Sequence, residues 1–112
     1  NFYNFDVLGG RKVSEQLIQS MWNIAVGASP KATLDCVTAW GTDFRQDLAK
    51  IDVPTLVIHG DADRIVPLDV TATRIQAAVK NAQLVVVEGG PHGLIWTHAE
   101  QVNAALLKFL AE

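Results

Sequence analysis

The chain has 112 residues, enough for one small domain at most, and 49% of them are hydrophobic, with a mean hydropathy of +0.18. Nine basic and 12 acidic residues give a formal charge of −3 without any basic stripe, so nucleic acid is a poor partner. The apolar stretches fall far short of the about 20 residues that a membrane-spanning helix needs, so no membrane contact is expected.

Residues 1–50 are expected to form helices and turns. The first helix is predicted after Ser14, a suitable N-cap residue, and Gly27 would end it. Its apolar residues recur at helical spacing: Leu17, Ile18, Met21, Trp22 and Ala25.

A second helix is predicted with Ser29 as its N-cap and Pro30 at the first helical position. We expect this helix to bury one face, formed by Leu34, Val37 and Trp40. Cys36 lies in the middle of the same helix and is expected to be a small core residue. A short third helix should follow, with Phe44 and Leu48 on one face.

Residues 51–112 show the pattern strand, helix, strand, helix. Residues 55–58 and 84–87 are continuous apolar runs that end at glycines, a pattern typical of strands buried on both faces of a parallel sheet. Between them a helix is predicted to open near Asp69, with apolar positions at Leu68, Ala72, Ile75 and Val79.

The last helix is predicted to start with a capping box formed by Thr97 and Glu100. His98 would then lie exposed in its first turn. The apolar stripe of this helix would consist of Val102, Ala105, Leu106, Phe109 and Leu110.

This order of elements predicts an α/β fold, because a strand, a helix and a strand in succession form a right-handed βαβ unit with parallel strands. Two strands buried on both faces do not make a complete sheet, and the sequence offers no further strands. We therefore interpret the chain as the end of a larger α/β sheet.

The residues that could carry chemistry follow the two predicted strands. Asp63 comes after the first and His92 after the second, 29 residues later, which is about the length of one βαβ repeat. Parallel neighbours lie about 4.8 Å apart, so the carboxylate should reach the imidazole. Such a pair suits acyl transfer, in which the carboxylate orients the histidine and the histidine takes a proton from a nucleophile.

No nucleophile accompanies this pair. The pattern Gly-x-Ser-x-Gly is missing, and the only serines are Ser14, Ser20 and Ser29. Ser29 follows Gly27 but lacks the second glycine and a preceding strand, so none of the three is a credible nucleophile.

Other polar residues near the pair have simpler interpretations. Asp61 beside Asp63 could suggest a metal site, but hard cations need more oxygen ligands, so turn stabilisation is favoured and no metal is expected. His59 is expected to make a hydrogen bond at the strand end. For Trp96, both an acyl-pocket role and ordinary core packing remain open.

At these residues the sequence becomes similar to a known family. The stretch from Ile51 through His59-Gly60, Asp63-Arg64 and Val66-Pro67 resembles the acid loop of α/β-hydrolases. The run 88–100, EGGPHGLIWTHAE, more closely resembles the cofactor-free haloperoxidases, which are esterase/perhydrolases. Two further stretches resemble the same subfamily: Phe2-Tyr3-Asn4 and Trp40-Gly41-Thr42-Asp43-Phe44-Arg45.

The resemblance implies that Asp63 is the triad acid and His92 the triad base, without a metal or haem cofactor. It also implies that residues 1–50 are the end of a helical cap with its return to the core, and that residues 51–112 are the C-terminal βαβα part of the fold. Members of this family hydrolyse small esters, and with hydrogen peroxide and a short carboxylic acid they form a peracid that oxidises halide. The serine would then lie in a missing N-terminal half of the same fold.

A non-catalytic role is the main alternative. In this hypothesis an exposed sheet edge recruits a second copy of the chain; a third hypothesis is a small binding domain that merely keeps the motif. A cytoplasmic location is expected, because no signal peptide is recognisable and one cysteine cannot form an internal disulfide.

Overall fold

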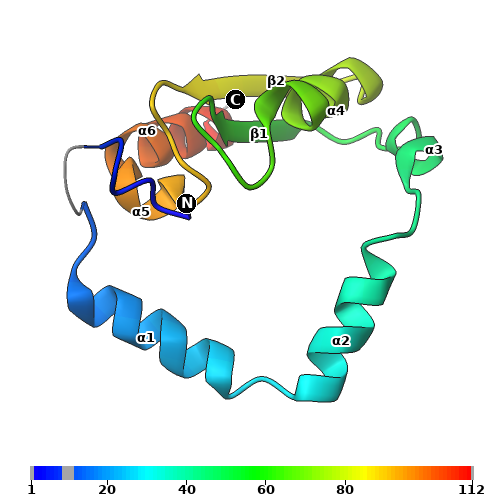
Figure 1. The fold of residues 1–112 in the computed structure, drawn as a ribbon. Coiled ribbons are helices and arrows are strands. Elements are labelled where there is room, and N and C mark those ends of the chain that lie inside the picture. Colours follow the sequence, from blue (N-terminus) through cyan, green and yellow to red (C-terminus); the bar gives the residue numbers. More distant parts are fainter. Residues whose placement is uncertain (1, 9–11, 112) are drawn as a thin grey trace.

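The structure is a computed structural model that describes residues 2–8 and 12–111. Residues 1, 9–11 and 112 lie outside it, so the outer ends of the predicted parts 1–50 and 51–112 fall outside the described residues. Figure 1 shows a small unit of strands and helices, and a run of helices that loops away from this unit and returns to it. In the described part of the chain, every helix is too short or too polar to cross a membrane.

A parallel βαβ unit forms the centre of the fold, as predicted. Strands β1 (Thr55–Gly60) and β2 (Ala82–Val87) pair in parallel, in a register that sets Gly60 opposite Val87. A 3-10 turn η1 (Leu68–Val70) and helix α4 (Ala72–Ala78) connect the two strands. Because both strands end at the same level, the loops that follow them leave the sheet side by side.

Helices α4 and α6 (Ala99–Leu110) both pack against the two strands. The core cluster joins Val87 at the end of β2 to Leu94 and Val102, with Ile58 of β1 packed against it. Val87 and Leu94 bracket the loop that carries His92, so burial of these apolar residues anchors both ends of that loop.

The expectation of strands buried on both faces is wrong for the described chain. The residues of β1 are half-buried except for Gly60, and Val86 of β2 is 46% exposed. The described sheet has only these two strands, so each keeps one edge without a neighbour. The two apolar strands are therefore only partly buried in the described chain.

The predicted starts of the first two helices and the predicted end of the first are confirmed. Helix α1 (Glu15–Val26) begins with the Ser14 side chain accepting a hydrogen bond from the Leu17 N–H, and Gly27 is its C-cap. Helix α2 (Pro30–Ala39) begins in the same way at Ser29, with Pro30 in its first turn.

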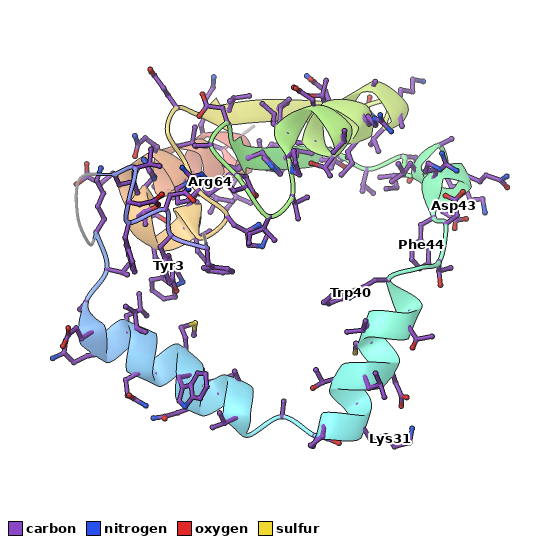
Figure 2. All side chains as sticks on the ribbon, viewed as in Figure 1. Tyr3, Lys31, Trp40, Asp43, Phe44 and Arg64 are labelled. Carbon is purple, nitrogen blue, oxygen red and sulfur yellow. The ribbon has the colours of Figure 1, made fainter. Side chains whose placement is uncertain are left out.

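The predicted burial of α2 is wrong. Leu34 is 65% exposed, Trp40 is 78% exposed, and Cys36 is exposed instead of lying in a core. Val37 is likewise exposed, and Figure 2 shows Trp40 projecting toward the middle of the ring that the chain forms. Neither α1 nor α2 buries a residue, because no other described helix or strand makes extensive contact with them.

The third and last helices also differ in detail from expectation. Helix α3 (Arg45–Leu48) is a single turn, with Phe44 as its N-cap and 59% exposed. The prediction of a capping box of Thr97 and Glu100 is wrong, because the N-cap of α6 is His98, which makes no side-chain cap hydrogen bond. Thr97 instead closes a separate short helix α5 (Leu94–Thr97), which the sequence pattern does not distinguish from α6.

Candidate active site

The loops after β1 and β2 are joined by backbone hydrogen bonds. The Asp61 N–H donates to the Val87 carbonyl, and the Ala62 N–H donates to the Gly90 carbonyl, each at 3.2 Å. The side chain of Asp61 adds a third bond, because its Oδ1 accepts the Gly89 N–H at 2.7 Å. The two loops are thus held together before any functional side chain is considered.

This close approach requires glycine at Gly60. A Cβ atom added there would lie 1.9 Å from the Gly90 carbonyl oxygen, which is backbone and cannot rotate away. Gly90 in turn approaches the Gly60 Cα atom so closely that its own Cβ would lie 3.0 Å from it. The pair of glycines therefore lets the two loops meet.

We expect Gly60→Ala to separate the loops and to lower the free energy of unfolding by about 1–3 kcal/mol or more, the usual cost of overpacking. Urea unfolding of the complete protein measures this loss. Gly27→Ala is the matched control, because a Cβ there would meet only carbonyl oxygens at 3.5 Å, an ordinary contact. A similar loss in both variants would contradict the close-approach argument.

Asp63 is buried, with a side chain only 3% exposed, and both of its carboxylate oxygens are engaged. Oδ1 accepts the N–H groups of Ile65 at 2.8 Å and Val66 at 2.9 Å. Burial alone would raise the pKa of Asp63, but hydrogen bonds from Val66, His92 and Ile65 outweigh it and hold the pKa below its ordinary value. The carboxylate is therefore ionised at neutral pH, and Oδ2 is left for a further donor.

That donor is His92, and the expected contact is present. The Nδ1 atom of His92 lies 2.9 Å from Asp63 Oδ2. Because an ionised carboxylate can only accept, the proton of this bond belongs to Nδ1. In the neutral imidazole Nε2 is then the basic nitrogen, and the ring is 34% exposed, so an incoming proton can reach it.

His59 makes the strand-end hydrogen bond that was expected. Its Nε2 lies 2.9 Å from the Val66 carbonyl, which requires Nε2 to be the donor. The same nitrogen lies 3.4 Å from Asp63 Oδ2, but its hydrogen is directed to the Val66 carbonyl. His59 thus fixes the turn whose Val66 N–H supports Asp63 from the other side.

Trp96 and His98 follow the histidine loop along the chain. Trp96 lies in α5, and His98 comes directly after this helix. Trp96 is 44% exposed and lines a shallow hollow along residues 96–101. The prediction that His98 is exposed is wrong: it is 8% exposed, and its Nδ1 lies 2.8 Å from Thr97 Oγ1. Burial, with a smaller effect from Lys12, lowers the pKa of His98, so a neutral ring is favoured.

The N-terminal segment is a part of the site that the sequence did not reveal. The Phe2 ring packs edge-to-face on His92, with ring centroids 5.0 Å apart. An apolar cavity of about 430 Å³ lies beside it, lined by Phe2, Tyr3, Ile18, Met21, Trp22 and Ala25. In Figure 2 Tyr3 points from this segment toward α1. Trp96 does not line this cavity.

Residues 2–99 match the family described as alpha/beta hydrolase fold. The chain belongs to the α/β-hydrolase fold family. A bromoperoxidase from Bacillus anthracis, known from its crystal structure, matches 99% of this chain with a TM-score of 0.91 and 46% identity. The two parallel strands with their helices are therefore part of an α/β-hydrolase fold.

Several similar proteins carry the names of non-heme haloperoxidases or esterases. A Synechocystis sp. protein, classed provisionally as a non-heme chloroperoxidase, is 61% identical over 109 residues, which are 97% of this chain and 40% of that protein. A bifunctional esterase/perhydrolase from Acinetobacter calcoaceticus is 38% identical over 110 residues, again 97% of this chain and 40% of the relative. The chain thus spans about 40% of the length of these relatives.

The arrangement can accept and return a proton, but neither of its two loops contains a serine. Ser14 and Ser29 use their hydroxyl oxygens as helix N-caps, far along the chain from the loops that hold Asp63 and His92. Within residues 2–8 and 12–111, no group of three or more acidic, histidine or cysteine side chains could hold a metal ion.

Proposed function

We propose that this chain supplies the acid and the base of a serine hydrolase, with Asp63 as the acid and His92 as the base. The observation that carries the proposal is the 2.9 Å contact between Asp63 Oδ2 and His92 Nδ1, at the carboxyl ends of two adjacent parallel strands. In α/β-hydrolases the acid and the histidine follow the serine along the chain, so the nucleophile would precede these 112 residues.

In the proposed reaction the serine hydroxyl attacks the carbonyl carbon of an ester, and its proton passes to His92 Nε2. The leaving alkoxide takes that proton and departs as the alcohol, which leaves an acyl-serine. Water then regenerates the carboxylic acid, again through Nε2. Asp63 stays ionised throughout and stabilises the imidazolium that forms in each step.

Small esters are the proposed substrates of hydrolysis. For a second reaction, perhydrolysis, the proposed substrates are a short carboxylic acid and hydrogen peroxide. The acid first acylates the serine and releases water, and hydrogen peroxide then takes the place of water and releases a peracid. The name of the Acinetobacter calcoaceticus relative, a bifunctional esterase/perhydrolase, supports this choice. The proposed chemistry uses no metal and no organic cofactor.

Within such an enzyme, residues 1–50 would form the end of a helical cap and its return to the core. Residues 51–112 would form the C-terminal βαβα part. The exposed apolar faces of α1 and α2 and the open edges of the two-stranded sheet support this division, because apolar surface of this extent calls for a covering partner. We propose the N-terminal half of the same fold as that partner.

Self-association is the second candidate, and the open strand edges favour it. In that case two copies of the chain would cover each other's sheets, and no serine would be needed. Sedimentation of the isolated chain distinguishes this role: a dimer that forms with rising concentration and binds no serine-reactive probe would favour association over catalysis.

The test of the proposed function compares the complete gene product with the isolated 112-residue chain. We expect the complete protein to hydrolyse short chromogenic esters and to react with a fluorophosphonate at one serine, and the isolated chain to do neither. Ester turnover by the isolated chain that His92→Ala abolishes would contradict the external nucleophile. A complete protein without turnover or labelling would contradict the serine hydrolase itself.

A further inference from the structure

The N-terminal strap, residues 2–6, is bonded to both loops of the candidate site. The Phe2 carbonyl accepts the Gly93 N–H at 2.8 Å, and the Asn4 Nδ2 group donates to the Ala62 carbonyl at 2.7 Å. Ala62 precedes Asp63, and Gly93 follows His92. One short segment therefore holds the neighbour of the acid and the neighbour of the base, as the position of the blue N-terminal segment beside α5 in Figure 1 illustrates.

Asn4 is a buried polar residue with a positive φ angle. It is 1% exposed and has a φ angle of 48°, in the left-handed region that asparagine tolerates better than most residues. Its Oδ1 atom is buried without a partner among the described residues. A buried unpaired oxygen and a left-handed backbone both destabilise the folded state. The hydrogen bond from the amide nitrogen of the same side chain to the Ala62 carbonyl must offset this cost.

The strap also packs directly on the histidine loop. A Cβ atom added to Gly93 would lie 2.5 Å from the Tyr3 ring and 2.9 Å from the Phe2 ring. The Phe2 ring in turn meets the imidazole of His92 edge-to-face. Any displacement of the strap would therefore be transmitted to the ring and to the backbone that orients it.

We infer that Asn4 is a positioning residue. Its bond to Ala62, together with the bond between Phe2 and Gly93, fixes the separation of the acid loop and the histidine loop, so that Asp63 Oδ2 stays within reach of His92 Nδ1. The effect on turnover rests on the proposed function, whereas the effect on the geometry of the pair does not. Asn4 itself donates to a backbone carbonyl and takes no part in the proton transfers.

Asn4→Gly tests this role in the complete protein, because glycine accepts the positive φ and removes only the amide. Asn4→Asp is the second variant, because it keeps the shape but replaces the donor by an acceptor that would face the Ala62 carbonyl. The matched control is Asp6→Asn on the same strap. It weakens the 2.9 Å ion pair between Asp6 and Arg64. The Asp6 side chain is 67% exposed and the Arg64 side chain 41% exposed, so this ion pair contributes little to stability.

We expect both Asn4 variants to lower kcat by about 10- to 100-fold per titrated serine, with KM changed less than about threefold, and Asp6→Asn to change neither. The proton NMR signal of the Nδ1–H bond between His92 and Asp63, far downfield of the amides, should broaden or vanish in both Asn4 variants. Counting active serines removes any contribution from misfolded protein.

An unchanged downfield signal in both Asn4 variants would overturn the inference. The inference would also be overturned if the variants lost activity only in proportion to their number of titrated serines, so that kcat per titrated serine stayed unchanged. The NMR comparison decides the matter even if the wild-type protein hydrolyses no ester, so failure of the proposed function and failure of this inference are distinguishable.

Discussion

Replacing His92 by alanine in the complete protein is expected to lower kcat/KM for a short ester by about 10⁶-fold, as loss of the histidine does in other triads. The reason is that, among the described residues, the other imidazole beside Asp63 is His59, which uses its Nε2 hydrogen on Val66. Initial rates with a chromogenic ester measure the loss, and thermal melting checks that the variant is folded.

Added imidazole should restore part of this activity, since truncation leaves space beside the Phe2 ring where a free imidazole can meet Asp63. His98→Gln is the matched control, because His98 bonds to Thr97 and not to the carboxylate. If His98→Gln removed as much activity per folded molecule as His92→Ala, the assignment of the base to His92 would be wrong.

Asp63→Asn is expected to lower kcat by about 10⁴-fold with little change in KM. An amide in place of Oδ2 would present an N–H to Nδ1, which favours the wrong imidazole tautomer and removes the charge that stabilises the imidazolium. Steady-state kinetics of the complete protein give both parameters.

The control for Asp63 is Asp61→Asn in the same loop. The amide oxygen of this variant can still accept the Gly89 N–H that Asp61 binds, so we expect activity within about threefold of wild type. A loss below tenfold in Asp63→Asn, with a larger loss in Asp61→Asn, would assign the acid to Asp61 instead.

Local patterns predicted the centre of the fold well. The apolar runs at 55–58 and 84–87 identified both strands, and parallel pairing followed from the helix between them. The contact between Asp63 and His92 could be predicted from chain spacing alone, because equal strand ends bring residues just beyond them to one edge. The caps at Ser14 and Ser29 were equally local and equally predictable.

Burial could not be predicted in the same way. Helical spacing identifies which face of a helix is apolar, but only a packing partner makes that face buried. For Leu34 and Trp40 no such partner lies among the described residues, so both are exposed. His98 shows the opposite error: it was expected to be exposed, yet the separate turn of α5 places it against Thr97 in the interior.

The N-terminal strap escaped prediction for a different reason. Asn4 and Ala62 are 58 residues apart, and neither periodicity nor a motif connects them. The positive φ of Asn4 leaves no trace in the sequence beyond the residue type. Only the resemblance of Phe2-Tyr3-Asn4 to the haloperoxidases marked this stretch as notable.

The most direct test of Asp63 and His92 as one catalytic unit is kcat/KM of the double variant Asp63→Asn/His92→Ala in the complete protein. Residues that act as a unit are strongly non-additive, so we expect the double variant to be within about threefold of His92→Ala alone. A further loss of about 10⁴, the full effect of Asp63→Asn, would mean that the two residues act independently and would contradict the proposed acid–base pair.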